Sequence, residues 1–135
     1  DSARYSIYDF VDAALLEQLG RVARILSGLR EESVEPVLIN WALHQEIRRL
    51  AMLAFARSRG QSLEAALAEQ KVWEKRKPLL RQALQRLTSA DCQHLLRVCA
   101  RTDRTIKGAE TGSPWDVLLA NGLRLAGVEL LPDEV

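Results

Sequence analysis

Apolar residues recur along most of the chain at spacings of three and four, which is the period of an amphipathic helix. The clearest stretch follows Arg21, where basic residues stand between the apolar positions. Its apolar face consists of Val22, Ile25, Leu26 and Leu29. Acidic and polar residues at 31–33 interrupt the pattern. The sequence therefore predicts an amphipathic helix that ends at this interruption.

Helix-start signals place two more helices in the first half of the chain. Ser6 followed by Asp9 is a capping pattern, and we expect a short helix from there to near Gly20. Pro36 suits the first turn of a helix, because its missing N–H would have no intrahelical partner there. A long central helix should follow. Residues 50–56 are apolar on every side, which predicts burial against several neighbours.

Similar signals divide the middle of the chain. Ser62 can cap a short, alanine-rich helix that runs through Gln70. A proline inside a helix costs about 3 kcal/mol, so Pro78 predicts a turn around Trp73 and a fresh helix starting near the proline. The residues of this helix expected to face the core are Leu80, Ala83, Leu84 and Leu87.

Two further helices complete the prediction. Thr88 or Ser89 caps the first, with buried positions at Cys92, Leu95, Leu96, Cys99 and Ile106. Ser113 starts the second as a cap followed by proline, and this helix should end near Gly127. Its expected buried residues are Trp115, Leu118, Leu119 and Leu123.

The fold class follows from these patterns. No segment alternates apolar and polar residues as a strand would, and β-branched residues are sparse. We predict a single all-α domain over residues 1–135, a bundle of about six or seven helices with short connections. The composition, 47% hydrophobic and 27% charged, is that of a globular domain. The chain begins at Asp1 without a methionine, so we interpret it as a fragment of a longer polypeptide.

Membrane, metal and thiol chemistry receive little support. The longest apolar run, 50–56, is far shorter than the roughly 18 residues of a membrane span. Cys92 and Cys99 lie about 10 Å apart along a helix, too far for a disulfide, so we expect free thiols of the kind usual in cytosolic proteins. His94 points away from Cys92 on such a helix, and the three residues cannot surround one zinc ion.

Two other polar features have ordinary interpretations. His44 shares a helical stripe with Asn40 and Arg48, where an imidazole usually makes simple hydrogen bonds. Gly108 and Gly112 are separated by three residues and no lysine follows them, whereas a phosphate-binding Walker loop needs four residues and a lysine. We therefore expect a connecting loop there and no nucleotide cofactor.

Positive charge is local, because 19 basic residues oppose 18 acidic ones. One cluster is Lys75, Arg76 and Lys77, next to Trp73. A second cluster is Arg101, Arg104 and Lys107. The two could form one patch for single-stranded nucleic acid if they packed together, with bases stacking on Trp73. Alternatively, the cations only solvate the surface and the tryptophan fills the core.

Three stretches resemble the C-terminal part of the bacterial DNA polymerase III delta subunits. They are EPVLINWALHQEIRRL, VWEKRKPLLRQAL and RTDRTIKGAETGSPWDVLL, and they follow in order over nearly the whole chain. The resemblance implies an all-α collar module of the pentameric clamp loader, which packs with gamma or tau and delta prime subunits in the bacterial replisome of the cytoplasm. It also implies that the sliding clamp is bound by upstream parts of the protein. This portion is then expected to have no enzymatic activity and to meet DNA only indirectly.

Carried over by motif, seven residues become candidates for a subunit contact or a surface facing DNA. They are Trp73, Lys75, Arg76, Lys77, Arg101, Arg104 and Lys107. We expect Trp73 to pack inward while the neighbouring cations face a partner subunit or the DNA path. The alternative function is a freestanding helical domain that binds single-stranded nucleic acid.

Overall fold

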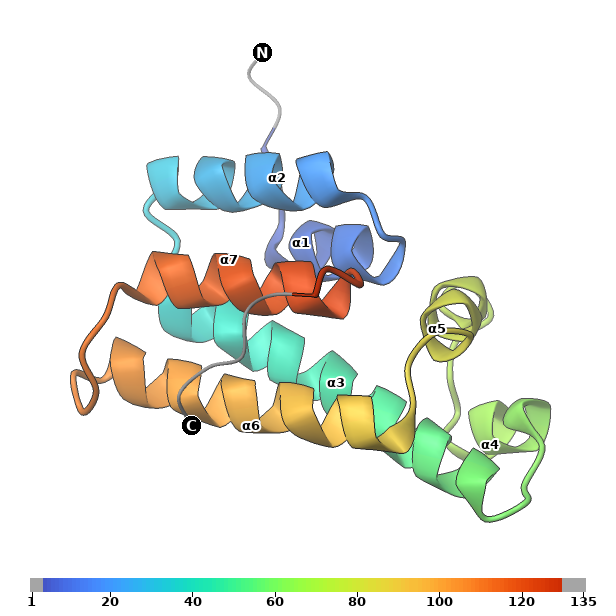
Figure 1. Cartoon of the computed structure of the whole chain (residues 1–135). Coiled ribbons are helices and arrows are strands. Elements are labelled where there is room, and N and C mark those ends of the chain that lie inside the picture. The colour runs from blue at the N-terminus through green and yellow to red at the C-terminus, as the bar shows by residue number, and fades with distance from the viewer. Residues whose placement is uncertain (1–3, 130–135) are drawn as a thin grey trace.

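The computed structural model describes residues 4–129, and within this range the chain is entirely α-helical, with no strand. Figure 1 shows the seven helices of this part of the chain. Their bounds are α1 (Ile7–Leu15), α2 (Leu19–Glu31), α3 (Pro36–Ser58), α4 (Leu63–Glu69), α5 (Lys77–Leu84), α6 (Ser89–Ile106) and α7 (Pro114–Leu125). The predicted all-α fold class is confirmed. No helix in the described range is long and apolar enough to cross a membrane.

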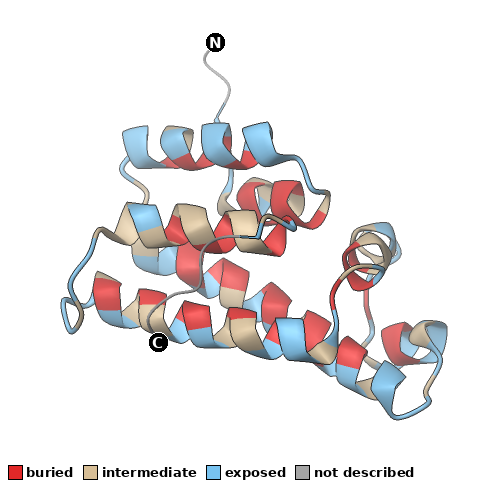
Figure 2. Cartoon of the chain, in the orientation of Figure 1, coloured by how far each residue is buried: buried red, intermediate tan, exposed pale blue. Residues whose placement is uncertain are grey.

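The long helix α3 organises the bundle. It packs along α6 and also contacts α1, α4, α5 and α7, while α2 packs against α1 and α7 (Figure 1). One apolar cluster takes buried side chains from all seven helices. The buried residues of each helix are red in Figure 2. Its largest fully buried members are Phe10, Leu15, Ile25, Leu29, Ile39, Leu43, Ile47, Leu50, Leu53, Leu67, Leu80 and Leu118.

The predicted helix starts are confirmed, and three of the seven in the described range are held by a capping side chain. Ser6 with Asp9, and Thr88 with Asp91, form reciprocal capping boxes, so Thr88 rather than Ser89 caps α6. Ser62 accepts a hydrogen bond from the Ala65 N–H at the start of α4. The hydroxyl of Ser113 makes no capping hydrogen bond, so α7 relies on the proline in its first turn.

The first helix ends earlier than predicted. It stops at Leu15, and Glu17 adopts a left-handed backbone with φ +63°, which turns the chain into α2. The guanidinium of Arg86 donates to the carbonyls of Ala14 and Leu15 at 3.3 and 3.2 Å, satisfying acceptors that a longer helix would have used. Gly20 lies in the first turn of α2 instead.

Burial also differs from prediction in two helices. In α3 the run 50–56 does pack against several neighbours, but Met52 and Phe55 are 52% and 56% exposed. In α7, Trp115 is only half-buried, and its ring faces the guanidinium of Arg30 at 5.5 Å. Other residues expected in the core and found only partly buried are Leu96, Ile106, Leu119 and Leu123. The physical reason is the same in each case. The apolar residues of these helices occupy a wider sector of the helix surface than the neighbouring helices cover.

Candidate subunit interface

Large apolar side chains are concentrated on the outer side of α3. Eight such side chains are exposed in the described range, and five of them belong to this helix. The eight are Tyr8, Leu19, Val37, Leu38, Trp41, Met52, Phe55 and Trp73. Because exposed large apolar side chains are concentrated there, this side of α3 is a candidate interface.

Six exposed positions of α3 form one stripe, which we call the α3 face. It consists of Leu38, Trp41, Gln45, Arg48, Met52 and Phe55. These positions alternate in spacing between three and four, so at 100° per residue they fall within a sector of about 100°. The stripe is about 26 Å long at 1.5 Å per residue. Its two ends are apolar, and its centre, at Gln45 and Arg48, is polar.

Three adjoining hollows lie along this stripe. The first lies between α3 and α6 and is lined by Val37, Asn40, Trp41, His44, Cys99, Ala100 and Asp103. The second, which we call the aromatic hollow, is lined by Tyr8, Val11, Trp41, Ala42, Gln45, Glu46, Arg49, Lys71, Trp73 and Arg76. The third is lined by Gln45, Arg48, Arg49, Met52, Ala56, Glu69 and Gln70. Trp41 lines both the first and the second hollow, and Gln45 and Arg49 line both the second and the third, so the three lie next to one another along α3.

Trp73 lies at the rim of the aromatic hollow and points outward. It is 77% exposed, so the prediction that it packs inward is wrong. The preceding Lys71 has φ +55°, and the N–H of Val72 then donates to the carbonyl of Leu67. Val72 is therefore the residue of this turn that enters the core, and it leaves Trp73 on the surface.

Arg76 makes internal contacts instead of facing outward. Its guanidinium donates to Asp12 of α1 at 2.6 Å and to Glu46 of α3 at 2.5 Å. Burial alone would lower the pKa of Arg76, but the hydrogen bonds that it donates to Glu46 and Asp12, with the negative charge of both, outweigh burial and raise the pKa above its ordinary value. Arg76 thus connects the turn before α5 to two other helices at the floor of the aromatic hollow.

The two lysines beside Arg76 differ from each other. Lys77 is largely covered, with a side chain 16% exposed, and it pairs with Glu74 at 2.6 Å. Lys75 is exposed, and no side chain among residues 4–129 forms an ion pair with it. Of this predicted basic cluster, only Lys75 presents its charge freely. Whether any of the three contacts a partner stays a prediction.

The cations of the second basic cluster are all engaged by two nearby carboxylates. Arg101 and Arg104 pair with Glu110 at 3.6 and 2.9 Å, and Lys107 pairs with Asp103 at 2.8 Å. This cluster lies at the C-terminal end of α6, whereas α5 lies near the opposite end of that helix (Figure 1). The structure does not bring the two basic segments together, so a shared patch is not formed.

The two cysteines are buried, protonated thiols at neutral pH. Cys92 and Cys99 are free and buried, as predicted. Burial raises the pKa of each thiol to about 11; Asp91 adds to this effect at Cys92, and the Asn121 hydrogen bond opposes it at Cys99.

The polar side chains Asn40 and His44 of α3 lie beside α6. The Asn40 side chain donates to the Cys99 carbonyl at 3.1 Å. His44 lines the first hollow beside it.

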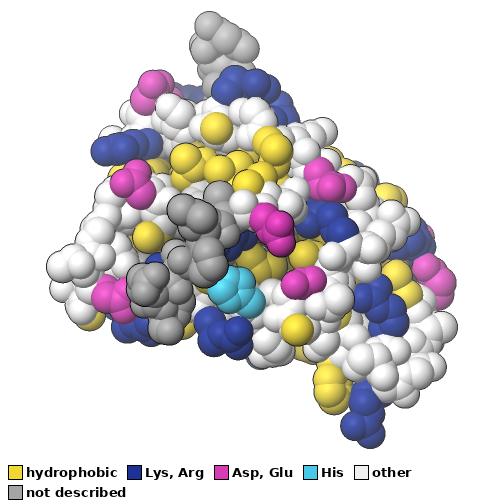
Figure 3. Space-filling model, viewed as in Figure 1, with side chains coloured by type: hydrophobic (Ala, Val, Ile, Leu, Met, Phe, Trp, Pro, Cys, Tyr) yellow, Lys and Arg dark blue, Asp and Glu magenta, His cyan; other side chains and the backbone are white. Residues whose placement is uncertain are grey.

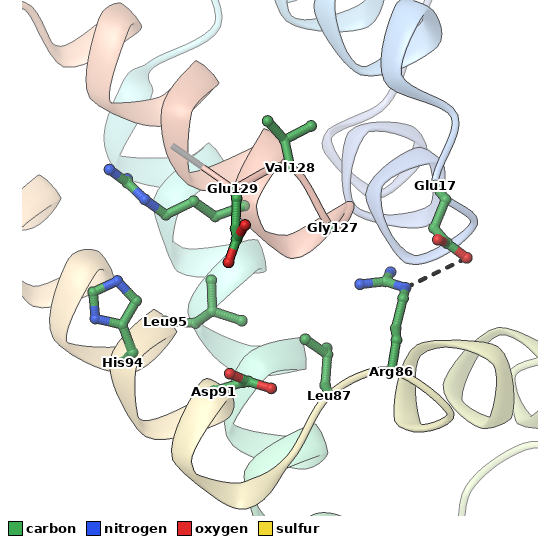
Figure 4. Close-up of a pocket in the computed structure, with 10 residues that line it drawn as sticks. Glu17, Arg86, Leu87, Asp91, His94, Leu95, Gly127, Val128 and Glu129 are labelled. Atoms are coloured by element: carbon green, nitrogen blue, oxygen red, sulfur yellow. Dashed lines mark ion pairs between the residues drawn. The ribbon is translucent and has the colours of Figure 1, made fainter. Parts of the chain in front are cut away.

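The face seen in Figures 3 and 4 is of a different kind. Charged side chains of both signs surround a short apolar band near α2 and α7 (Figure 3). A hollow on this face is lined by Glu17, Arg86, Asp91, His94 and residues 127–129, which follow α7, as Figure 4 shows. Arg86 is engaged structurally, because it donates to the Leu125 carbonyl at 2.6 Å and pairs with Glu17 at 3.4 Å. No cluster of three potential metal ligands occurs among the residues described.

The α3 face was missed by sequence reasoning, although the sequence carried a signal for it. Apolar residues occupy more of the circumference of α3 than a one-sided helix needs. That surplus predicts deep burial. The same surplus is also expected for a helix whose inner side packs against its own chain and whose outer side binds a partner chain.

Comparison with known proteins supports a specific family. Residues 7–133 match the family described as processivity clamp loader gamma complex DNA pol III C-term. The chain is 30% identical over 115 residues to DNA polymerase III subunit delta of Escherichia coli, covering 85% of this chain and 33% of that protein. It is 29% identical over 122 residues to the same subunit of Haemophilus influenzae, covering 84% of this chain and 36% of that protein.

The chain thus spans about a third of the length of these relatives. The matched region includes all seven helices of the described range, so the resemblance seen in the sequence motifs extends over the whole bundle. The chain belongs to the family of C-terminal regions of the DNA polymerase III clamp-loader gamma complex, and it is similar to the C-terminal part of the delta subunit.

Proposed function

We propose that this domain is the collar module of a delta subunit, and that it assembles the clamp loader by packing against gamma or tau and delta prime subunits. The observation that carries the proposal is the exposed apolar character of the α3 face in a chain of this family. In this proposal the domain has no catalytic role, and contact with the sliding clamp belongs to other parts of the protein. It would act in the cytoplasm, within the bacterial replisome.

The composition of the α3 face supports a protein partner. Tryptophan and other aromatic side chains dominate the binding energy of protein interfaces, and Trp41, Phe55 and Met52 are all about half exposed. A stable interface buries on the order of 1,200 to 2,000 Å² in total. A stripe about 26 Å long with hollows beside it is long enough to form the centre of such an interface.

Reconstitution with partner subunits tests the proposal. The protein is mixed with gamma and delta prime, and complex formation is followed by size-exclusion chromatography. We expect the Met52→Ser/Phe55→Ser variant to assemble at least about tenfold more weakly, since interface hot spots contribute 2 kcal/mol or more each. Leu19→Ser is the matched control, because Leu19 is similarly exposed but lies on α2. If the folded wild type joins neither subunit, the proposal is wrong.

The exposure of Trp73 favours a second candidate function, contact with single-stranded nucleic acid. This tryptophan is flanked by the exposed residues Lys71 and Lys75, and no side chain among residues 4–129 pairs with either lysine. Stacking of a base on an aromatic side chain contributes about 1–3 kcal/mol and tolerates any sequence. The second basic cluster adds little to this candidate, because its cations are paired with Glu110 and Asp103.

A titration with a single-stranded oligonucleotide tests the second candidate at low and physiological salt. Binding should weaken as salt rises, and Trp73→Ala should reduce the affinity by roughly tenfold, the equivalent of one stacked base. Trp115→Ala is the control for loss of a tryptophan elsewhere. An affinity unchanged by Trp73→Ala would remove this candidate.

A further inference from the structure

We infer that the partner segment that covers the α3 face is an acidic amphipathic helix, with apolar side chains at its two ends and carboxylates between them. The inference rests on the proposed function and adds the chemistry of the partner. It follows from the order of apolar and basic side chains along α3 and in the hollows beside it.

Unpaired positive charge gathers at the centre of the face. Three cations border the aromatic hollow and the third hollow: Arg48 and Arg49 of α3, and Lys71 in the turn after α4. None of these three side chains forms an ion pair or a hydrogen bond with another side chain in the described range. Elsewhere arginines are typically engaged, as Arg76 is with Glu46 and Arg81 is with Glu64.

The nearby carboxylates do not cancel this charge. Glu46, at the floor of the aromatic hollow, is already bound by Arg76. Glu69, at the far edge of the third hollow, accepts a hydrogen bond from Gln61 and is the other carboxylate lining these two hollows. Three unpaired cations therefore face one remaining carboxylate. A partner that brings carboxylates would complete this surface electrostatically.

Two apolar sites flank the basic centre. The aromatic hollow, of about 570 Å³, lies among Tyr8, Trp41 and Trp73 and can admit a bulky apolar side chain. Met52 and Phe55 form the second site, eleven residues after Trp41 along the same face. Eleven helical residues span about 16 Å, so a partner helix of three turns lying nearly along α3 would reach both sites at once.

This order of side chains favours a helix over nucleic acid. A polynucleotide would present phosphates along its whole length, whereas the Met52–Phe55 end of the face offers an aliphatic and an aromatic side chain. An amphipathic helix places apolar anchors in hollows at intervals of one or more turns. Carboxylates on the middle turn would then lie beside Arg48 and Arg49.

Charge reversal in the assembled complex tests the inference. Arg48→Glu and Arg49→Glu are each introduced into the full-length protein, with Arg24→Glu, an exposed arginine on α2, as the matched control. We expect either α3 variant to weaken assembly with gamma and delta prime by roughly tenfold, as for loss of a charged pair at an interface. Assembly of the wild type should weaken as salt rises, and that dependence should decrease in the variants.

A second arm identifies the partner segment. A photo-crosslinking amino acid at position 49 should attach to an acidic helix of a partner subunit. Replacing one acidic residue of that partner helix by lysine should then partly restore assembly with the Arg48→Glu variant.

The outcomes separate this inference from the proposed function. If Met52→Ser/Phe55→Ser abolishes assembly while both charge reversals leave it unchanged, the face is an interface but its partner is not acidic, and the inference is wrong. If the charge reversals weaken oligonucleotide binding and leave assembly intact, the occupant is nucleic acid and the inference is also wrong. If no α3 variant affects assembly, both the inference and the assigned interface are wrong.

Discussion

The backbone of α7 at Gly122 lies directly against the ring of Phe10, so close that a Cβ at Gly122 would be 2.6 Å from Phe10 Cζ. The same Cβ would be 3.3 Å from a methyl carbon of Val22. Phe10 is fully buried, so its ring cannot move aside without disturbing the core. The absence of a side chain at Gly122 therefore lets α1, α2 and α7 meet.

We predict that Gly122→Ala destabilises the domain by about 1–2 kcal/mol, because overpacking outweighs the better helix propensity of alanine. Urea unfolding measures the change. Gly20→Ala is the control, because the nearest atom to its Cβ would be the flexible Arg24 Nη1 at 3.7 Å. That control should be neutral or slightly stabilising. Equal effects at the two glycines would contradict the prediction.

Helix starts were predictable because their signals are local. Ser6 with Asp9, and Thr88 with Asp91, satisfy the first backbone N–H groups from within four residues of sequence. The end of α1 was not predictable in this way. Its last carbonyls bind the guanidinium of Arg86, which is more than 70 residues away in the chain. Only the folded arrangement brings that donor to the helix end.

The candidate site shows the same limit. The sequence marked the segment around Trp73 as unusual, but whether Val72 or Trp73 enters the core depends on the left-handed backbone at Lys71. The internal contacts of Arg76 depend on carboxylates from two other helices. A count of cations in a short segment does not reveal such partners. It therefore overestimates the positive charge that a surface presents.

The contacts of Arg76 should contribute to stability. Arg76→Met would leave Glu46, whose side chain is 11% exposed, without a partner, and we predict a loss of about 2 kcal/mol in the free energy of unfolding. Lys75→Met, one residue away and without an ion pair in the described range, should change it by less than about 0.5 kcal/mol. A double-mutant cycle with Glu46→Gln would isolate the pair. A cycle showing no coupling would disprove the contribution.

Two capping positions give a matched comparison. The Thr88 hydroxyl accepts a hydrogen bond from the Asp91 N–H at 3.1 Å, whereas Ser113 makes no such bond at the start of α7. Thr88→Ala should therefore cost about 1 kcal/mol, and Ser113→Ala clearly less. Chemical denaturation of both variants provides the measurement. A larger loss for Ser113→Ala would show that its hydroxyl does cap the helix.

The buried thiols predict a pH dependence. Their pKa values of about 11 in the folded protein lie above the roughly 8.5 of an unfolded cysteine. As pH rises above about 8.5, the unfolded chain releases thiol protons that the folded chain retains, so the free energy of unfolding decreases towards pH 11. The decrease should be smaller in Cys92→Ala/Cys99→Ala. Ultraviolet absorbance of the thiolates should show the folded titration directly, and a folded midpoint near 8.5 would contradict the prediction.

The exposure of Trp73 leads to the last prediction, because buried and exposed tryptophans respond to truncation very differently. Removing a fully buried aromatic side chain costs about 3–5 kcal/mol, which is the result expected for Phe10→Ala. Trp73 is 77% exposed, so Trp73→Ala should change the free energy of unfolding by less than about 0.5 kcal/mol. In a variant that retains only this tryptophan, acrylamide should quench the fluorescence more strongly than in one that retains only the half-buried Trp115. A large loss of stability in Trp73→Ala, together with weak quenching, would mean that the ring packs inward after all. A stable variant that is readily quenched would leave the ring available to a partner on the outer surface.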